Sequence, residues 1–252
     1  MVSHGDRVTG KVALISGGAR GMGAAHARRL AEEGGSVVVG DLLDEEGAAL
    51  VAELGEDRAA YVHLDVTDLR SWDAAVAAAH ERFGRIDVLV SNAGIFTRGN
   101  VVDATVDDWM RTIEVDLTGV FLGMKAVVPT MRAQGSGSII NISSIAGLVG
   151  FKNRAAYAAA KWGVHGLTKT SALDFGPDGV RVNSVHPGSV RTAMTADLKR
   201  GLGQVPLGRD ADPREVSDLV LFLASDESAF CNGGSFVVDG GETAGNALRE
   251  DA

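Results

Sequence analysis

The sequence has a single cysteine, no basic run and no long apolar run, and each absence excludes a class of protein. Cys231 alone among 252 residues cannot form an internal disulfide, so a disulfide scaffold is excluded. The net charge of −9, with no basic cluster, argues against a nucleic-acid partner. The N-terminus lacks the apolar stretch of a signal peptide, and the longest apolar runs fall far short of the ~20 residues of a membrane-spanning helix. We therefore expect a cytoplasmic protein without a membrane segment.

Short β-branched runs alternate with longer Ala-rich stretches along the chain, and several of the runs are apolar on both faces. Such runs are typical of parallel strands that helices cover on both sides. The expected strands are 12–16, 36–40, 60–64, 87–91, 138–142, 181–185 and 235–239. The expected helices are 21–33, 45–54, 71–83, 107–133, 155–175 and 213–224. This rhythm predicts one α/β domain over residues 1–252 with a doubly wound parallel sheet, a substrate lid near 193–208 and a loose tail at 242–252.

A glycine-rich turn follows the first expected strand and opens the first expected helix, with Gly17, Gly21 and Gly23 spaced G-x-x-x-G-x-G. Glycines at such a turn let the backbone approach a pyrophosphate, and the start of the helix supplies free N–H groups. The spacing differs from the G-x-G-x-x-G fingerprint, so an ordinary tight turn between strand and helix is the alternative.

Asp41 ends the second expected strand, 18 residues beyond Gly23. A carboxylate there can accept hydrogen bonds from the adenosine ribose and repels a 2′-phosphate, which favours NAD over NADP. Arg20 in the glycine turn would partly offset that repulsion. Asp65 and the Asn92-Ala93-Gly94 turn follow the third and fourth strands, where ligands of open parallel sheets bind.

Tyr157 and Lys161 are four residues apart in an expected helix and so share a face, and Ser144 directly follows the fifth strand. Free tyrosine is a poor base near neutrality, but a nearby ammonium favours the phenolate. Such a tyrosine can take a proton from an alcohol while hydride leaves the carbon, and a serine can position the oxygen. Taken alone, the Y-x-x-x-K pattern also fits a surface lysine beside a half-buried tyrosine.

Together these residues resemble the short-chain dehydrogenase/reductase family along the whole chain. The signatures that carry the resemblance are residues 17–23, Asp65, 92–94, Ser144, Tyr157 with Lys161, 186–188 and 239–241. The resemblance implies a Rossmann fold and a nicotinamide-dependent oxidoreductase. In it Tyr157 is the acid/base, Lys161 binds the nicotinamide ribose and supports the tyrosine, and Ser144 orients the substrate.

The resemblance also implies which residues contact the cofactor. These are Gly17, Arg20, Gly21, Met22, Gly23, Asp41, Leu42, Asp65, Val66, Asn92, Ala93, Gly94, Tyr157, Lys161, Pro187, Gly188, Val190 and Thr192.

Two positions depart from the family pattern. Asp116 stands where the family has the asparagine that completes a catalytic tetrad, and Ser91 replaces the first asparagine of N-N-A-G. If the proton relay uses the backbone at 116, aspartate can substitute. If it uses the side-chain amide, aspartate removes a donor and adds a charge.

The substrate residues are expected to form an apolar cleft suited to a bulky lipophilic alcohol or ketone. They are Phe96, Ser144, Ile145, Leu148, Met194 and Leu198. Segments such as 40–47 and 183–188 narrow the resemblance to bacterial NAD-dependent 3α,20β-hydroxysteroid dehydrogenases, which implies a steroid-like substrate. Ordinary loop packing explains the apolar residues equally well.

Two other functions remain open: a 3-oxoacyl-thioester reductase of the same family, which Asp41 disfavours, and an NAD-binding regulator without turnover. No metal is expected, because the six histidines are scattered without ligand spacing. The resemblance also implies a homotetramer in which helices 107–133 and 155–175 pair between subunits, with a second contact near 233–241.

Overall fold

The computed structural model describes residues 5–193, 195 and 202–245, and one parallel sheet runs through them. Its order is β3-β2-β1-β4-β5-β6-β7, so the chain reverses direction across the sheet between β1 and β4. The strands are β1 (Val12–Ser16), β2 (Ser36–Asp41), β3 (Ala59–His63), β4 (Val88–Ser91), β5 (Gly137–Ile142), β6 (Val180–Pro187) and β7 (Ser235–Val238). The predicted doubly wound seven-stranded sheet is confirmed, and a crevice for ligands is expected at the point of reversal.

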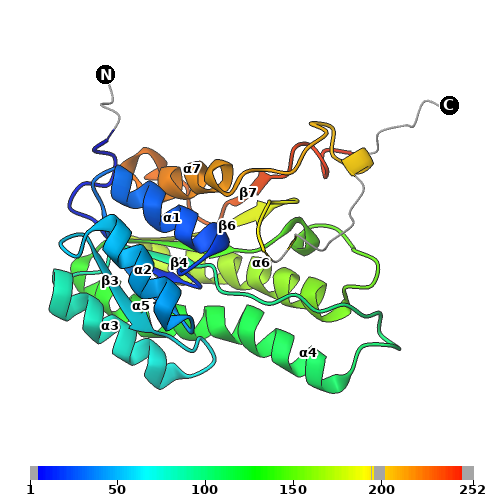
Figure 1. The fold of residues 1–252 in the computed structure, drawn as a ribbon, viewed down its shortest axis with the longest axis horizontal. Coiled ribbons are helices and arrows are strands. Elements are labelled where there is room, and N and C mark those ends of the chain that lie inside the picture. The colour runs from blue at the N-terminus through cyan, green and yellow to red at the C-terminus, as the bar shows by residue number, and fades with distance from the viewer. Residues whose placement is uncertain (1–4, 194, 196–201, 246–252) are drawn as a thin grey trace.

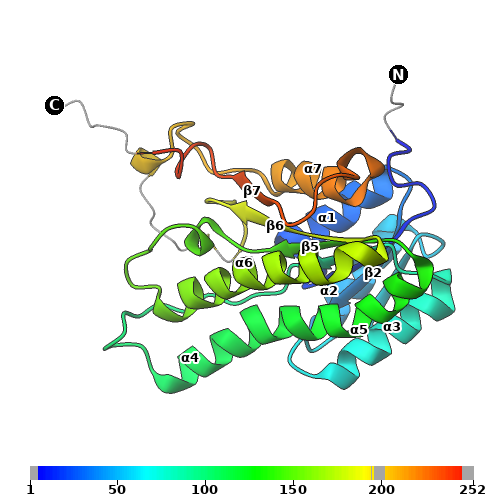
Figure 2. The same cartoon turned by 180° about the vertical axis from the view of Figure 1, so that it is seen from behind.

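Helices cover both faces of the sheet, as Figures 1 and 2 show. One layer contains α1 (Gly21–Glu32), α2 (Asp44–Leu54) and α7 (Pro213–Ala224), and the other contains α3 (Leu69–Phe83), α5 (Gly119–Gln134) and α6 (Ala155–Phe175). Each layer buries its own apolar cluster against the strands, and Trp72 of α3 is fully buried in the second. The strands are therefore apolar on both faces, which explains why their sequence runs are continuous rather than alternating.

Local signals set the ends of several helices. Asp212 caps α7, where its side chain accepts from the Arg214 N–H at 3.0 Å while Glu215 accepts from the Asp212 N–H at 2.8 Å. Pro213 occupies the first turn, where its missing N–H costs nothing. Gly84 ends α3 in the left-handed conformation, with φ of 77°.

The helix expected at 107–133 is not one regular helix. It consists of α4 (Val106–Ile113), a π-helical turn at Glu114–Thr118 and then α5, and Figure 2 shows α4 and α5 following one another along the same rod. A π turn fits an extra residue into the helix and changes the direction of its side chains. Here the turn contains Asp116, which is fully buried. The apolar period of the sequence carries no signal for this turn.

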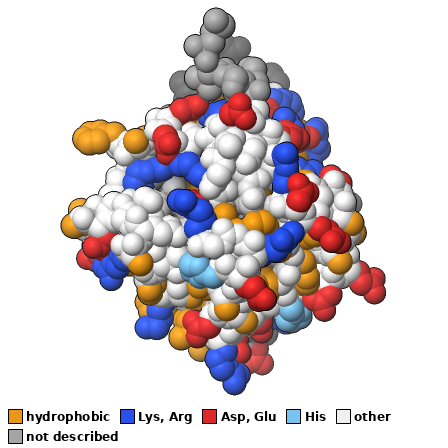
Figure 3. Space-filling model, turned by 90° about the vertical axis from the view of Figure 1, so that its left-hand side faces the viewer, with side chains coloured by type: hydrophobic (Ala, Val, Ile, Leu, Met, Phe, Trp, Pro, Cys, Tyr) orange, Lys and Arg blue, Asp and Glu red, His pale blue; other side chains and the backbone are white. Residues whose placement is uncertain are grey.

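The end of the molecule where the strands begin carries charges of both signs, mixed over the surface drawn in Figure 3. At this end, ion pairs connect segments that are distant in sequence, among them Lys11–Asp226 and Arg132–Asp178. No helix within the described residues is long and apolar enough to cross a membrane.

Apolar side chains are exposed on α4, α5 and α6. They include Val106, Trp109, Met110, Phe121 and Trp162. These helices are the ones expected to pair between subunits, which stays a prediction.

Candidate active site

Two predicted cofactor segments meet where β1 and β4 end. The Ser16 hydroxyl accepts from the Asn92 and Ala93 N–H groups at 3.1 and 3.2 Å. The Asn92 amide donates to the carbonyl oxygens of Ser16 and Gly17 at 3.1 and 2.9 Å. The Asn92 side chain therefore braces the glycine turn, and its own buried oxygen has no hydrogen-bond partner among the described residues.

The glycine turn has the shape that a pyrophosphate requires. A Cβ at Gly17, where φ is 62°, would lie 2.7 Å from the Ala93 Cα, and one at Gly23 would lie 2.0 Å from the Gly17 oxygen. Arg20 precedes α1 without capping it through its side chain. The first N–H groups of α1 are thus available to an anion, as a dinucleotide phosphate requires.

Asp41 lies beside this turn. Its carboxylate accepts from the backbone N–H groups of Ala19 at 2.9 Å and Leu42 at 2.8 Å, which fixes its orientation at the end of β2. Asp65, after β3, is oriented by the N–H of Thr67 at 2.9 Å and by the Thr67 hydroxyl. Both carboxylates therefore lie at the edge of the sheet where an adenosine would be expected.

The segment after β6 faces the glycine turn from the other side. The methyl group of Thr192 is 3.7 Å from the position that a Cβ on Gly21 would occupy. Val190 is buried and pairs as an isolated bridge with Ala211, which holds this segment in place. The glycine turn and the segment after β6, both predicted to contact the cofactor, are thus near one another, and Gly188 lines the adjoining cavity.

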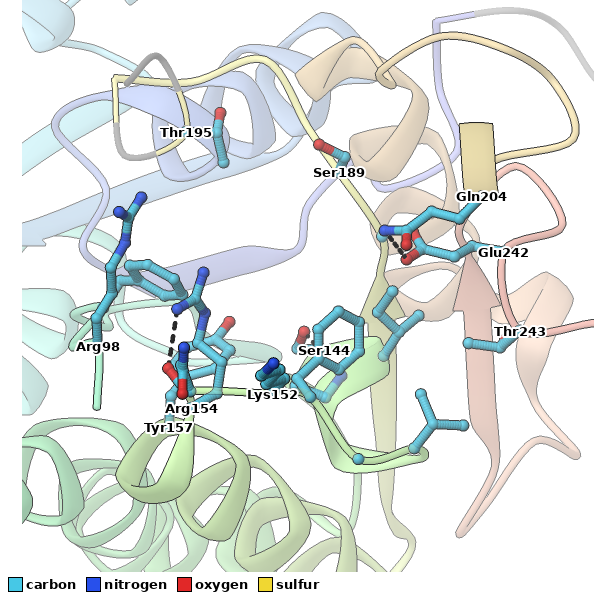
Figure 4. A pocket seen from close by; sticks show the side chains of 18 of the residues that line it. Arg98, Ser144, Lys152, Arg154, Tyr157, Ser189, Thr195, Gln204, Glu242 and Thr243 are labelled. Carbon is cyan, nitrogen blue, oxygen red and sulfur yellow. Dashed lines mark hydrogen bonds between the residues drawn. The ribbon is translucent and has the colours of Figure 1, made fainter. Parts of the chain in front are cut away.

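That cavity, of about 1170 Å³, is lined by Ser144 and Tyr157 together (Figure 4). Close packing of α6 against the 3₁₀ turn Ile145–Gly147 explains their proximity. The Ser143 hydroxyl donates to the Lys161 carbonyl at 3.0 Å, and a Cβ on Gly147 would lie 2.6 Å from that same oxygen. Only glycine permits this approach, which carries Ser144 to the Tyr157 face of α6.

Lys161 is buried behind Tyr157. Its ammonium nitrogen lies 5.6 Å from the centre of the Tyr157 ring, donates to the Ile142 carbonyl at 3.2 Å and is 3.4 Å from Asp116 Oδ2. Burial lowers the pKa of Lys161, but the negative charges of Asp116 and Tyr157 more than offset this and raise it above its usual value. The lysine therefore stays protonated next to the tyrosine.

Asp116 links Lys161 to the turn after β4. Its Oδ1 accepts from the Ile95 N–H at 2.7 Å, and a Cβ on Gly94 would lie 3.3 Å from Oδ2. Burial raises the pKa of Asp116, although Lys161 and the Ile95 N–H oppose that rise. Its side chain thus serves as an ion-pair partner and acceptor, neither of which requires an amide donor.

We predict that Asp116→Asn shifts the pH dependence of turnover and leaves cofactor affinity nearly unchanged. Without the Asp116 charge, burial lowers the pKa of Lys161, so the loss of activity at alkaline pH begins at lower pH. A kcat/KM profile and a cofactor titration on both proteins measure this. Superimposable profiles would show that the charge at position 116 does not affect the pH dependence of turnover.

His186 supports Ser144 from behind. Its Nδ1 donates to the Ser144 carbonyl at 2.9 Å, and its Nε2 accepts from the Ser184 hydroxyl at 2.8 Å. Burial lowers the pKa of His186 to about 4, so the ring is neutral near pH 7. His186, part of the 186–188 signature, thus holds the backbone of the serine in place, a role that the sequence did not indicate.

Only some of the expected substrate residues line the cavity. Phe96 and Ile145 line the cavity with Ser144, whereas Leu148 does not and Val149 lies there instead. Leu148 caps the C-terminal end of the 3₁₀ turn, and the next residue along the chain lines the cavity. Met194 and Leu198 fall outside the described residues, as do residues 196–201 of the expected lid and 246–252 of the expected tail.

The lining is also less apolar than expected. Three cations contribute to it, Arg98, Lys152 and Arg154, and so do Asp103 and Glu242. They come from the loop after β4, the segment before α6 and the turn after β7, which no hydrophobic pattern groups together. In the parts of the chain that the structure describes, no group of three or more histidine, cysteine or acidic side chains could hold a metal ion.

Comparison with known proteins agrees with this geometry. A family model described as enoyl-(acyl carrier protein) reductase matches residues 17–243. The trans-4-hydroxycyclohexanecarboxylate dehydrogenase of Sinomonas cyclohexanicum is 70% identical over 98% of both chains. A 3-alpha-(or 20-beta)-hydroxysteroid dehydrogenase of Mycobacterium tuberculosis is 56% identical over 97% of this chain and 94% of its own.

A solved structure, that of levodione reductase, superimposes with a TM-score of 0.88 at 36% identity, over 95% of this chain and all of the other. The family match, the relatives and the shared fold all indicate the same family. The chain belongs to the short-chain dehydrogenase/reductase family, whose dehydrogenases use nicotinamide cofactors.

Proposed function

We propose that this protein oxidises a secondary hydroxyl on an alicyclic ring, reversibly and with NAD. The observation that carries the proposal is the position of Tyr157 and Ser144 in one cavity, with buried Lys161 behind the tyrosine. The relatives support the ring: one is named for a hydroxycyclohexane acid and the other for a hydroxysteroid.

In this reaction the hydroxyl of Ser144 holds the substrate oxygen in position. Tyr157, as the phenolate, takes the hydroxyl proton of the alcohol, and the ammonium of Lys161 stabilises the negative charge on the tyrosine. A bound oxidised nicotinamide supplies the acceptor for the hydride that leaves the same carbon. The alcohol carbon thus loses two electrons and becomes a ketone, and the proton passes through Tyr157 to solvent.

Asp41 is the basis for proposing NAD over NADP, because a fixed carboxylate repels a 2′-phosphate and accepts from a free ribose hydroxyl. We predict that Asp41→Asn lowers the ratio of kcat/KM for NAD to that for NADP by about 10- to 100-fold, the value of a hydrogen bond to a charged group. Steady-state kinetics with both cofactors measure the ratio. An unaltered ratio would show that another residue sets the preference.

A steroid is the second candidate substrate, favoured by the hydroxysteroid dehydrogenase relative and by a cavity of about 1170 Å³, which has room for a polycyclic skeleton. Reduction of a 3-oxoacyl thioester is less favoured, because Asp41 does not suit NADP. The intact Ser144, Tyr157 and Lys161 argue against a regulator without turnover.

The test is a panel assayed with NAD and NADP: trans-4-methylcyclohexanol, a 3α-hydroxysteroid and, in the reductive direction, acetoacetyl-coenzyme A. We expect oxidation of the cyclohexanol with NAD. Turnover of the thioester alone would favour the reductase, and no turnover of any compound would overturn the proposed function.

A further inference from the structure

We propose that the substrate carries a carboxylate remote from its hydroxyl, and that Arg154, with Arg98 and Lys152, binds it. This inference rests on the proposed function and narrows its substrate. The ring alcohol carries a negative charge on its carboxylate, and the three cations select for that charge. None of the three was among the residues singled out in the sequence, because they do not belong to the family signatures.

Arg154 is held at a short distance from the reacting group. Its guanidinium carbon lies 4.3 Å from the centre of the Phe96 ring, and that ring packs edge-on against Tyr157 with centres 5.3 Å apart. Phe96 thus contacts both the cation and the tyrosine. Arg154, Phe96 and Tyr157 all line the cavity, so a substrate with its hydroxyl at Tyr157 has the guanidinium on the same wall.

The two arginine segments are paired through their backbones. Gly99 and Arg154 form an isolated bridge, in which the Ala155 N–H donates to the Gly99 carbonyl at 3.0 Å and the Gly99 N–H donates to the Asn153 carbonyl at 3.2 Å. Arg98 therefore lies next to the segment that carries Arg154. The pairing brings both guanidinium-bearing segments to one wall of the cavity.

Charge is divided across the cavity. In Figure 4, Arg98 and Arg154 are on the same side as Tyr157, whereas Glu242 lies on the opposite side. There Glu242 accepts from the Gln204 amide at 2.9 Å. Asp103, the other acid of the lining, accepts from the Asn100 amide. A chain with net charge −9 thus places three cations in the lining of the cavity that holds Tyr157.

The chemistry of these side chains favours a carboxylate. A guanidinium is a planar fork that binds carboxylates through two parallel hydrogen bonds, and it remains charged at every working pH. A neutral ring alcohol offers these three cations no opposite charge to bind. Phosphates of an acyl-thioester carrier are the competing anion, and the experiment separates the two.

The experiment compares trans-4-hydroxycyclohexanecarboxylate with its methyl ester, which differs in charge and little in shape. We expect the native enzyme to favour the acid, chiefly through KM, and added salt to raise KM for the acid alone. Arg154→Gln should lower kcat/KM for the acid by about 10- to 100-fold and change that for the ester little. Arg132→Gln is the matched control, since Arg132 also lies over a phenylalanine ring, that of Phe175, but outside the cavity.

Arg98→Gln, at an exposed side chain, provides a second variant whose folding is secure, and we expect a smaller loss confined to the acid. An equal fall for acid and ester in Arg154→Gln would assign the arginine to packing and overturn the inference. A native enzyme that prefers the ester would also overturn the inference. The same holds if Arg154→Gln lowers kcat/KM for acetoacetyl-coenzyme A and leaves that for the acid unchanged. Turnover of trans-4-methylcyclohexanol without preference for the acid would leave the proposed function standing, whereas no turnover of any ring alcohol would overturn both.

Discussion

Tyr157→Phe is expected to lower kcat for alcohol oxidation by about 100- to 10,000-fold, the contribution typical of a positioned acid/base. The substitution removes one oxygen atom and retains the ring that packs edge-on against Phe96. The protein should therefore remain folded and bind NAD with nearly native affinity. Kinetics with a ring alcohol, together with a fluorescence titration of the reduced cofactor, measure both quantities.

Tyr61→Phe is the matched control, because Tyr61 is the other tyrosine of the chain. Its hydroxyl donates to the Asp41 carbonyl at 2.7 Å and to Asp44 at 2.6 Å, away from the cavity, and kcat should stay near native. Appreciable turnover by Tyr157→Phe would show that another group moves the proton. If the native protein is as inactive as the variant on a broad panel, the regulator gains support.

Lys161→Met is expected to reduce both turnover and stability. The substitution leaves Asp116, which is fully buried, without the ammonium 3.4 Å from its Oδ2. Removal of one member of a buried ion pair typically lowers the free energy of unfolding by about 3–5 kcal/mol. Urea unfolding measures this loss, and kcat should fall because the charge that stabilises the tyrosine phenolate is gone.

The double variant Lys161→Met/Asp116→Asn separates the two effects. It removes the unpaired charge, so we expect it to regain much of the stability while kcat stays low. If the double variant were no more stable than Lys161→Met, the buried pair would not be the cause of the loss.

The stability of Lys161→Met should also depend on pH. Because burial raises the pKa of Asp116 above its ordinary 3.8, the folded state holds this proton more tightly than the unfolded state. The contribution of Asp116 is then favourable below 3.8 and is lost as pH rises through the raised value. The single variant should thus approach the double variant in stability as pH falls, and a constant difference would contradict the pKa direction.

Much of the fold follows from the sequence because its signals are local. Runs apolar on both faces predicted parallel strands, and Asp212 with Pro213 marked the start of α7. The glycine turn and Asp41 were placed together from their positions after consecutive strands, since parallel strands end at one edge of a sheet. Ser144, Tyr157 and Lys161 could be singled out because their spacing matches a signature of the family.

The tertiary structure decided what no local pattern contains. Whether the chain around Asp116 forms a regular or a π turn depends on packing against Ile95 and Lys161, residues distant in sequence. Likewise, Arg98 and Arg154 are 56 positions apart and come to one wall only because Gly99 pairs with the segment before α6. The sequence by itself determined the family and the fold, and it predicted the reacting groups, whose spacing is local. The charge of the cavity was decided by contacts between loops, because such contacts form only once the sheet has brought those loops together.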